Sequence, residues 1–209
     1  MQIIQDSTIL PYLIWPFLGY LIGSISSAVL VSKLFRLSDP RQTGSGNPGA
    51  TNVLRSGNKF AALFTLLGDL AKGLIPVLLA IHYQLPNSII ALVAIAAFMG
   101  HLYPVFLKFQ GGKGVATAIG VFLALSWKLA LVFAVVWLLS AAISRYSSLA
   151  ALLASAATAL SSFTIFDQSN QLQLVGAIIL IVAFLFKRHR ENIDRLKAGT
   201  ESKIGADKK

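Results

Sequence analysis

The chain has 209 residues, of which 56% are hydrophobic and only 12% are charged, and its mean hydropathy is +0.72. Soluble proteins carry about 25% charged residues, so this composition excludes a soluble domain and indicates an integral membrane protein. The chain contains no cysteine, which excludes disulfides, thiol nucleophiles and cysteine-ligated metals. The net charge of +10 would suit nucleic-acid binding, but the positions of the charges argue against it.

Seven apolar segments follow one another, and we expect each to be a membrane-spanning helix. They are residues 9–32, 60–81, 89–106, 115–125, 129–143, 149–166 and 172–186. A hydrocarbon core of about 30 Å needs about 20 helical residues, so the fourth and fifth segments are short. The sequence predicts an all-α polytopic integral membrane protein with seven transmembrane helices, in which residues 1–209 form a single membrane-embedded domain.

Basic residues gather on one side of these segments. Strict alternation places residues 33–59, 107–114, 144–148 and 187–209 on one face, and the loops of the other face hold a single Lys or Arg, Lys128. Because cytoplasmic loops are enriched in Lys and Arg, we expect the N-terminus outside and the C-terminus in the cytoplasm. The basic tail would lie on anionic lipid. This distribution explains the net charge without nucleic acid.

A polar stretch follows the first segment and reads Thr43-Gly44-Ser45-Gly46-Asn47-Pro48-Gly49-Ala50-Thr51-Asn52-Val53-Leu54-Arg55. Glycine and asparagine tolerate positive φ, so such a loop can turn several N–H groups toward one point. Consecutive inward N–H groups form an anion-sized nest, and the Arg55 guanidinium is a bidentate partner for phosphate. The ordinary alternative is a Gly/Pro turn between helices. The density of amides and hydroxyls favours an anion-binding loop.

A second glycine-rich stretch, Gly111-Gly112-Lys113-Gly114, precedes the fourth segment on the same predicted face. Glycines before a helix let backbone N–H groups approach an anion, which the helix dipole favours, and Lys113 adds a positive charge. The spacing is not that of a Walker A motif, so ATP hydrolysis is not expected. The alternative is a glycine hinge with an interfacial lysine. Beside the first loop, phosphate binding is favoured.

Two charges, Asp69 and Lys72, lie inside the second segment. Charges at this depth cost about 2.5–3.5 kcal/mol each on insertion scales and are usually functional. At i and i+3 on a helix they can neutralise each other, so a structural ion pair is the equal alternative. His101 is a candidate base or a structural residue at a helix end. His189 and Asn192 are also i, i+3 and would share one helical face.

Four stretches in this order resemble the bacterial acyl-phosphate–glycerol-3-phosphate acyltransferases, the PlsY family. They are Ser45-Gly46-Asn47-x-Gly49-Ala50-Thr51-Asn52-x-x-Arg55, Gly68-Asp69-x-x-Lys72-Gly73, Gly111-Gly112-Lys113-Gly114-Val115-Ala116-Thr117 and Arg188-His189-x-Glu191-Asn192-Ile193. The resemblance covers essentially the whole chain. One small departure is Gln110, where the family often has Lys.

The resemblance implies transfer of a fatty acyl group from acyl phosphate to the 1-hydroxyl of sn-glycerol 3-phosphate, giving lysophosphatidic acid for phospholipid synthesis. It implies a multi-pass protein of the bacterial inner membrane, with its site facing the cytoplasm, a lipid bilayer around it and a functional link to an enzyme that makes acyl phosphate. No metal or cofactor is expected, since the donor is an activated anhydride.

Residue roles follow from the same comparison together with the chemistry above. We expect catalytic roles for Ser45, Arg55, His189 and Asn192, and structural or supporting roles for Asp69, His101 and Glu191. We expect substrate binding by Gly46, Asn47, Thr51, Asn52, Lys72, Gly111, Gly112, Lys113 and Gly114. Because no base lies beside Ser45 in the sequence, we expect direct attack by the acceptor hydroxyl and no acyl-enzyme.

Two other classes of protein remain open at this point. A transporter of a phosphorylated metabolite would also use seven segments, buried charges and interrupting glycines. Against it, the sequence shows no inverted repeat, and its polar loops gather on one face rather than at the midplane. A purely structural membrane subunit would leave the polar loops unexplained.

Overall fold

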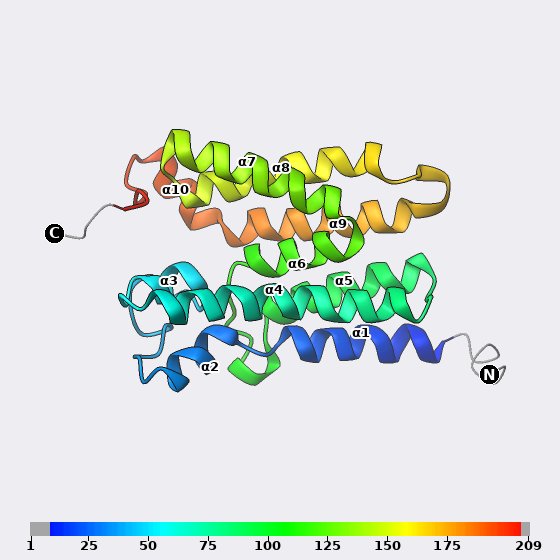
Figure 1. Cartoon of the computed structure of the whole chain (residues 1–209), viewed down its shortest axis with the longest axis horizontal. Helices are drawn as coiled ribbons and strands as arrows, with labels where there is room; N and C mark the ends of the chain where they lie inside the picture. Colours follow the sequence, from blue (N-terminus) through cyan, green and yellow to red (C-terminus); the bar gives the residue numbers. More distant parts are fainter. Residues whose placement is uncertain (1–8, 206–209) are drawn as a thin grey trace. The chain divides into compact units, whose positions relative to one another are not determined.

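The structure, a computed structural model, describes residues 9–205, and every regular element among them is helical. The α-helices are α1 (Leu10–Gly23), α2 (Ser27–Leu34), α3 (Ala50–Leu54), α4 (Lys59–His82), α5 (Asn87–Leu102), α6 (Val115–Leu125), α7 (Trp127–Ser144), α8 (Ser147–Ile165), α9 (Gln168–Arg188) and α10 (Arg190–Lys197). A short 3₁₀ turn covers Val105–Leu107. The helices form two compact units that divide between Leu125 and Ser126 (Figure 1). The all-α class is as predicted, and the single domain stays a prediction.

Six helical segments in the described part of the chain are long and apolar enough to cross a membrane. They are Leu10–Leu34, Lys59–His82, Asn87–Leu107, Trp127–Ser144, Ser147–Ile165 and Ser169–Arg188. The remaining apolar helix, α6, has 11 residues, which rise about 16 Å against a core of about 30 Å. The chain is therefore a multi-pass membrane protein. A seventh span stays a prediction, as does the sidedness of the termini, which lie outside the described residues.

The first unit is built on close helix–helix contacts. Helix α1 packs along α5, and α4 packs on α5 and α6. A Cβ on Gly23 of α1 would overlap the carbonyl of Ala97 in α5, and one on Gly120 of α6 would overlap the carbonyl of Leu70 in α4. Small residues let helix backbones approach closely in lipid, where packing rather than the hydrophobic effect drives association. These contacts hold the polar residues of α4 and α5 in fixed positions.

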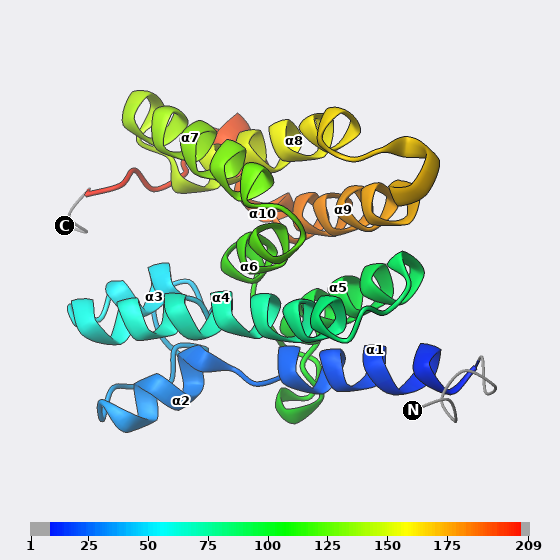
Figure 2. The ribbon, with the colours of Figure 1, turned by 45° about the vertical axis from the view of Figure 1, so that its right-hand side comes forward.

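The first apolar segment is interrupted, although the sequence predicts one helix over 9–32. Helix α1 ends at Gly23 and α2 begins at Ser27, as Figure 2 shows in the two blue helices. The Ser26 side chain caps α2 by accepting from the N–H of Val29 at 3.4 Å. Lys72 Nζ donates to the Ile25 carbonyl at 2.9 Å. A buried charge from another helix thus satisfies backbone that the interruption leaves without a helical partner.

In the second unit, α7 packs on α8, and α8 packs on α9 (Figure 1). The short helix α10 contacts α8 and α9. His189 ends α9 and precedes α10, so one residue stands at the junction of the two helices. Beyond α10, Ile204 donates its N–H to the Arg145 carbonyl at 2.7 Å. The chain after α10 therefore returns to the turn between α7 and α8.

Candidate functional site

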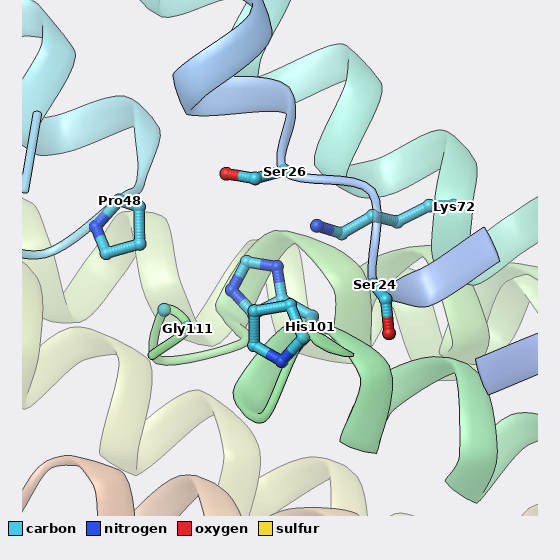
Figure 3. A pocket seen from close by; sticks show the side chains of 8 residues that line it. Ser24, Ser26, Pro48, Lys72, His101 and Gly111 are labelled. Carbon is cyan, nitrogen blue, oxygen red and sulfur yellow. The ribbon is translucent and has the colours of Figure 1, made fainter. Parts of the chain in front are cut away.

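A polar pocket lies in the first unit, where residues distant in sequence meet. Its lining residues are Ser24, Ser26, Pro48, Lys72, His101, Pro104, Gly111 and Gly112. They come from the α1–α2 interruption, the polar loop, α4, the end of α5 and the glycine-rich stretch. Figure 3 shows the ammonium group of Lys72 pointing into the space beside the His101 ring. Three of the four motifs singled out in the sequence therefore contribute to one pocket.

The buried charges of α4 form an ion pair, which was one of the two alternatives that the sequence left open. Lys72 Nζ lies 2.8 Å from Asp69 Oδ1, and both side chains are buried. His101 Nδ1 lies 3.6 Å from the same oxygen. Since an ammonium has three donors, the contacts with Asp69 and the Ile25 carbonyl leave one for a ligand in the pocket. Lys72 is thus both a structural partner of Asp69 and a cation at the pocket wall.

The glycine-rich stretch packs tightly on the end of α5. The N–H of Gly112 donates to the His101 carbonyl at 3.2 Å. This N–H is therefore bonded within the protein, and binding of an anion by Gly112 stays a prediction. A Cβ on Gly112 would overlap Nε2 of His101, and one on Gly111 would overlap the His101 carbonyl. These two residues must be glycine for the stretch to reach the pocket.

The other two residues of the stretch lead into α6. Gly114 has φ +87°, a conformation that favours glycine, and a Cβ there would also overlap the Phe98 ring. Lys113 is half-buried and Gly114 is buried. Gly111 and Gly112 line the pocket and Lys113 and Gly114 do not, so phosphate binding by the complete stretch stays a prediction.

The polar loop is organised around the side chain of Asn52, which is 5% exposed. Its Nδ2 donates to the carbonyls of Pro40 at 2.6 Å and Thr43 at 3.0 Å, and its Oδ1 accepts from the N–H of Ser45 at 2.9 Å. Both amide hydrogens and the oxygen are therefore engaged within the loop. The Asn52 side chain therefore stabilises the conformation of the loop. The substrate contact expected for Asn52 stays a prediction.

Most other predicted residues of the loop face outward. Ser45, Gly46, Thr51 and Arg55 are exposed, and Asn47 is half-buried. None of these five lines the pocket, which the loop reaches through Pro48. The loop thus offers its hydroxyl and guanidinium groups to solvent while its backbone is held from beneath by Asn52.

An ion pair that sequence reasoning missed fixes the start of this loop. The Arg41 guanidinium contacts both carboxylate oxygens of Asp39, with Nη2 at 2.6 Å from Oδ2 and Nε at 3.0 Å from Oδ1. These hydrogen bonds hold the pKa of Asp39 below its ordinary value. Thr43 Oγ1 donates to the Asp39 carbonyl at 3.3 Å. The signal was an acidic and a basic residue two positions apart beside a proline, which is common in loops.

In the second unit, His189 and Asn192 are both buried, at 3% and 5% exposure. His189 Nδ1 lies 2.8 Å from the Leu185 carbonyl. Since a carbonyl can only accept, Nδ1 carries the hydrogen, and Nε2 of the neutral ring is the acceptor nitrogen. Asn192 Nδ2 donates to Glu201 Oε1 at 2.6 Å. Both side chains are thus held in defined orientations.

The carboxylate that orders this region is Glu201, not Glu191. The resemblance implies a structural role for Glu191, yet its side chain is 87% exposed and lies 3.9 Å from Arg195. Glu201 is 9% exposed and accepts from Ser148 Oγ at 2.6 Å, Asn192 Nδ2 at 2.6 Å and Arg195 Nε at 2.7 Å. Burial raises the pKa of Glu201, but these three hydrogen bonds outweigh it and lower the pKa. Nothing in the local sequence around Glu201 predicts this position.

Comparison with known proteins covers nearly the whole chain. The family model for glycerol-3-phosphate acyltransferases matches residues 13–199. A glycerol-3-phosphate acyltransferase of Burkholderia cenocepacia is 54% identical over 191 residues, covering 91% of this chain and 90% of the relative. One from Ralstonia nicotianae is 53% identical over 207 residues, covering 97% and 99%.

Solved structures agree with these sequence relatives. The crystal structure of PlsY (YgiH), an integral membrane glycerol 3-phosphate acyltransferase, in its glycerol 3-phosphate form is 38% identical and superposes with a TM-score of 0.86 over 93% of this chain and 96% of that chain. Its lysophosphatidic acid form is 37% identical, with a TM-score of 0.85 over 93% and 95%.

Proposed function

Because the chain belongs to the glycerol-3-phosphate acyltransferase family, we propose that its donor is an acyl phosphate. The fatty acyl group passes to the 1-hydroxyl of sn-glycerol 3-phosphate, and lysophosphatidic acid and inorganic phosphate leave. The new ester bond forms as the acyl–phosphate anhydride bond breaks, and the hydroxyl proton goes to a base. No cofactor is needed, since the anhydride is already activated.

The pocket of the first unit carries this proposal. It brings Lys72, His101, Gly111 and Gly112 together beside the polar loop. An acyl phosphate donor needs a fixed cation near its phosphate, and Lys72 keeps one N–H for that purpose. Preorganised donors near developing negative charge are the largest single source of catalysis in acyl transfer. A small polar pocket with one buried ammonium suits a phosphate group.

The polar loop supplies the reacting groups in this proposal. Ser45 donates a hydrogen bond to the donor phosphate or to the developing oxyanion, and Arg55 binds phosphate through its planar guanidinium. Gly46, Asn47 and Thr51 contact substrate, and Asn52 holds the loop in the required shape. The acceptor hydroxyl attacks directly in a ternary complex, and catalysis consists mainly of positioning and charge stabilisation.

The base in this proposal is His189 or an oxygen of the substrate phosphate. The hydrogen on Nδ1 of His189 faces the Leu185 carbonyl, so Nε2 is the nitrogen that can accept a proton. Asn192 contributes hydrogen bonds from its amide. Asp69 and His101 support Lys72, Gly111 and Gly112 from within the first unit.

The membrane arrangement is part of the same proposal. Seven spans, with α6 as the shortest, would place the N-terminus outside and the C-terminus in the cytoplasm of a bacterial inner membrane. The site would face the cytoplasm, where glycerol 3-phosphate and an enzyme producing acyl phosphate are found. A reporter near Gly46 or after Lys209 should then be cytoplasmic and one at Asn87 external. Reporters at Gly46 and Gly112 on opposite faces would contradict this arrangement.

The donor assignment is tested with purified protein in detergent micelles. Palmitoyl phosphate and labelled glycerol 3-phosphate should give labelled lysophosphatidic acid, and palmitoyl-CoA at the same concentration should give little. Double-reciprocal plots of the initial rate against one substrate, at several fixed concentrations of the other, should intersect, as a ternary complex requires. Turnover with palmitoyl-CoA alone would overturn the donor. If a labelled acyl group were trapped on Ser45 at a rate fast enough to account for turnover, the mechanism would proceed through an acyl-enzyme and not by direct attack.

The role of the pocket is tested separately by Gly112→Ala. The added methyl would displace the His101 ring, and KM for glycerol 3-phosphate or palmitoyl phosphate should rise roughly tenfold or more, since small misplacements are costly. Gly176→Ala in α9 is the matched control, because a Cβ there meets nothing within 4 Å. Unchanged kinetics in Gly112→Ala would remove the pocket from the site.

A further inference from the structure

The chain beyond α10 makes an ordered return across the second unit, and Glu201 stands at its centre. Its carboxylate receives hydrogen bonds from Ser148 of α8 and from Asn192 and Arg195 of α10. Three residues later, Ile204 exchanges hydrogen bonds with Arg145 through the Ile204 N–H and the Arg145 guanidinium. The carboxylate is therefore anchored on both sides, and it is the acceptor shared by α8 and α10.

The contact with Glu201 fixes which way the Asn192 amide faces. An asparagine side chain has a donor end and an acceptor end of nearly equal size, so packing alone does not choose between them. An ionised carboxylate can only accept, which obliges Nδ2 of Asn192 to face it at 2.6 Å. The Asn192 Oδ1 must then point away from Glu201. A charge-assisted bond of this length is among the stronger hydrogen bonds of a protein.

We propose that Glu201 is a positioning residue for the acyl transfer, acting by holding the amide of Asn192 in the one orientation that serves the substrate. This inference rests on the proposed role of Asn192. Arg195 donates to the other carboxylate oxygen and keeps the group ionised and in place, and Ser148 adds one hydrogen bond from α8. Glu201 itself touches no substrate.

The neutral isostere cannot replace the carboxylate. Oε1 receives both Ser148 and Asn192, and Oε2 receives Arg195. In Glu201→Gln, one of these positions becomes an NH₂ group. If the NH₂ faces Arg195, two donors meet there, and if it faces Asn192, the Asn192 amide must turn over to present its oxygen. In the first orientation Oε1 still accepts from Asn192, but the side chain has lost its charge and its bond to Arg195. In the second orientation the Asn192 amide turns over. Both outcomes weaken the hold on that amide while the shape of the side chain stays the same.

The experiment is a double-mutant cycle between Glu201→Gln and Asn192→Ala in purified protein. We expect each single variant to lower kcat/KM about 10- to 100-fold, as expected for losing a hydrogen bond to a charged group. The double variant should be no worse than Asn192→Ala, because Glu201 acts only through that amide. Asp194→Asn is the matched control, since it removes an exposed carboxylate from the same helix and should behave as wild type.

A second variant separates positioning from simple fastening of the tail. Ser148→Ala removes one hydrogen bond to Glu201 but leaves its contact with Asn192, so thermal stability should fall while kcat/KM stays within about twofold of wild type. Equal losses of activity in Ser148→Ala and Glu201→Gln would overturn the inference, as would additive effects in the cycle or full activity of Glu201→Gln.

The outcome does not depend on the identity of the donor. The cycle compares variants in one assay, so it is read with whichever of palmitoyl phosphate and palmitoyl-CoA supports turnover by the wild-type protein. Turnover with palmitoyl-CoA alone would contradict the proposed donor and leave the comparison of Glu201→Gln with Asn192→Ala intact. Full activity of Asn192→Ala would overturn the inference itself.

Discussion

The polar loop and the α10 region each depend on a buried asparagine, but the two side chains are held in different ways. Asn52 bonds only to backbone of its own loop, at Pro40, Thr43 and Ser45. Asn192 bonds to a side chain, the carboxylate of Glu201. The first arrangement shapes a loop and leaves its chemistry to neighbouring residues. The second orients the asparagine itself, so the side chain that is held in place is also the one that we propose acts on the substrate.

The largest expected effect is the loss of activity on removing the Ser45 hydroxyl from the polar loop, whose shape Asn52 maintains. Ser45→Ala should lower kcat about 10²–10³-fold, the usual loss for one oxyanion donor, without lowering thermal stability, because the side chain is exposed. Initial rates and thermal unfolding in the same micelles measure both quantities. Ser56→Ala is the control, since that exposed hydroxyl bonds only to the Val53 carbonyl within its own turn. Normal turnover by Ser45→Ala would remove Ser45 from the reaction.

Asn52→Ala removes the hydrogen bonds that hold the polar loop in its shape. Three hydrogen bonds to the loop backbone are lost, and at about 1 kcal/mol each the free energy of unfolding should fall by about 3 kcal/mol. Thermal unfolding gives the stability, and limited proteolysis should detect cleavage near residues 39–48. Activity should fall as the loop loses its shape. A stable but inactive Asn52→Ala would instead indicate direct contact with substrate.

The variant Asn192→Asp tests the contact between position 192 and Glu201. A new carboxylate would face Glu201 at hydrogen-bond distance, and two carboxylates that share a site cannot both ionise without cost. One of them should hold a proton at lower pH, which restores a hydrogen bond between the two groups. Relative to wild type, kcat/KM should recover roughly tenfold from pH 8 to pH 6. Asn192→Ala places no carboxylate opposite Glu201, so it should show no such recovery.

The smallest effect concerns stability in acid. The folded-state pKa of Glu201 lies below its ordinary 4.5, so its stabilising contribution is complete above pH 4.5 and is lost as pH falls through the folded pKa. Its nearest charged partner is Arg195. Wild-type protein should be more stable than Glu201→Gln at pH 6, and the difference should shrink below pH 4.5. A constant difference in thermal midpoint would contradict this linkage. Asn52→Ala should differ from wild type by the same amount at both pH values.

Much of the molecule was predictable from local sequence. Hydropathy predicted helices at the positions of α4, α5, α7, α8 and α9, because a span must satisfy its backbone within its own segment. The i, i+3 spacing of Asp69 and Lys72 predicted their ion pair, since both partners lie on one helix. The four motifs also identified the family. Each of these features depends on residues that are neighbours along the chain.

Other features were decided only by the tertiary structure, because they are hydrogen bonds between residues that are distant along the chain. The interruption after α1 is satisfied by Lys72, which lies 47 positions from Ile25. The N–H of Gly112 is taken by the His101 carbonyl, and the carboxylate that holds Asn192 is Glu201 while Glu191 is exposed. A hydrogen bond requires two atoms within about 3 Å, and sequence spacing sets that distance only inside one helix or turn. Across helices, packing sets it, and so the roles of Lys72, Gly112 and Glu201 emerge only in the folded chain.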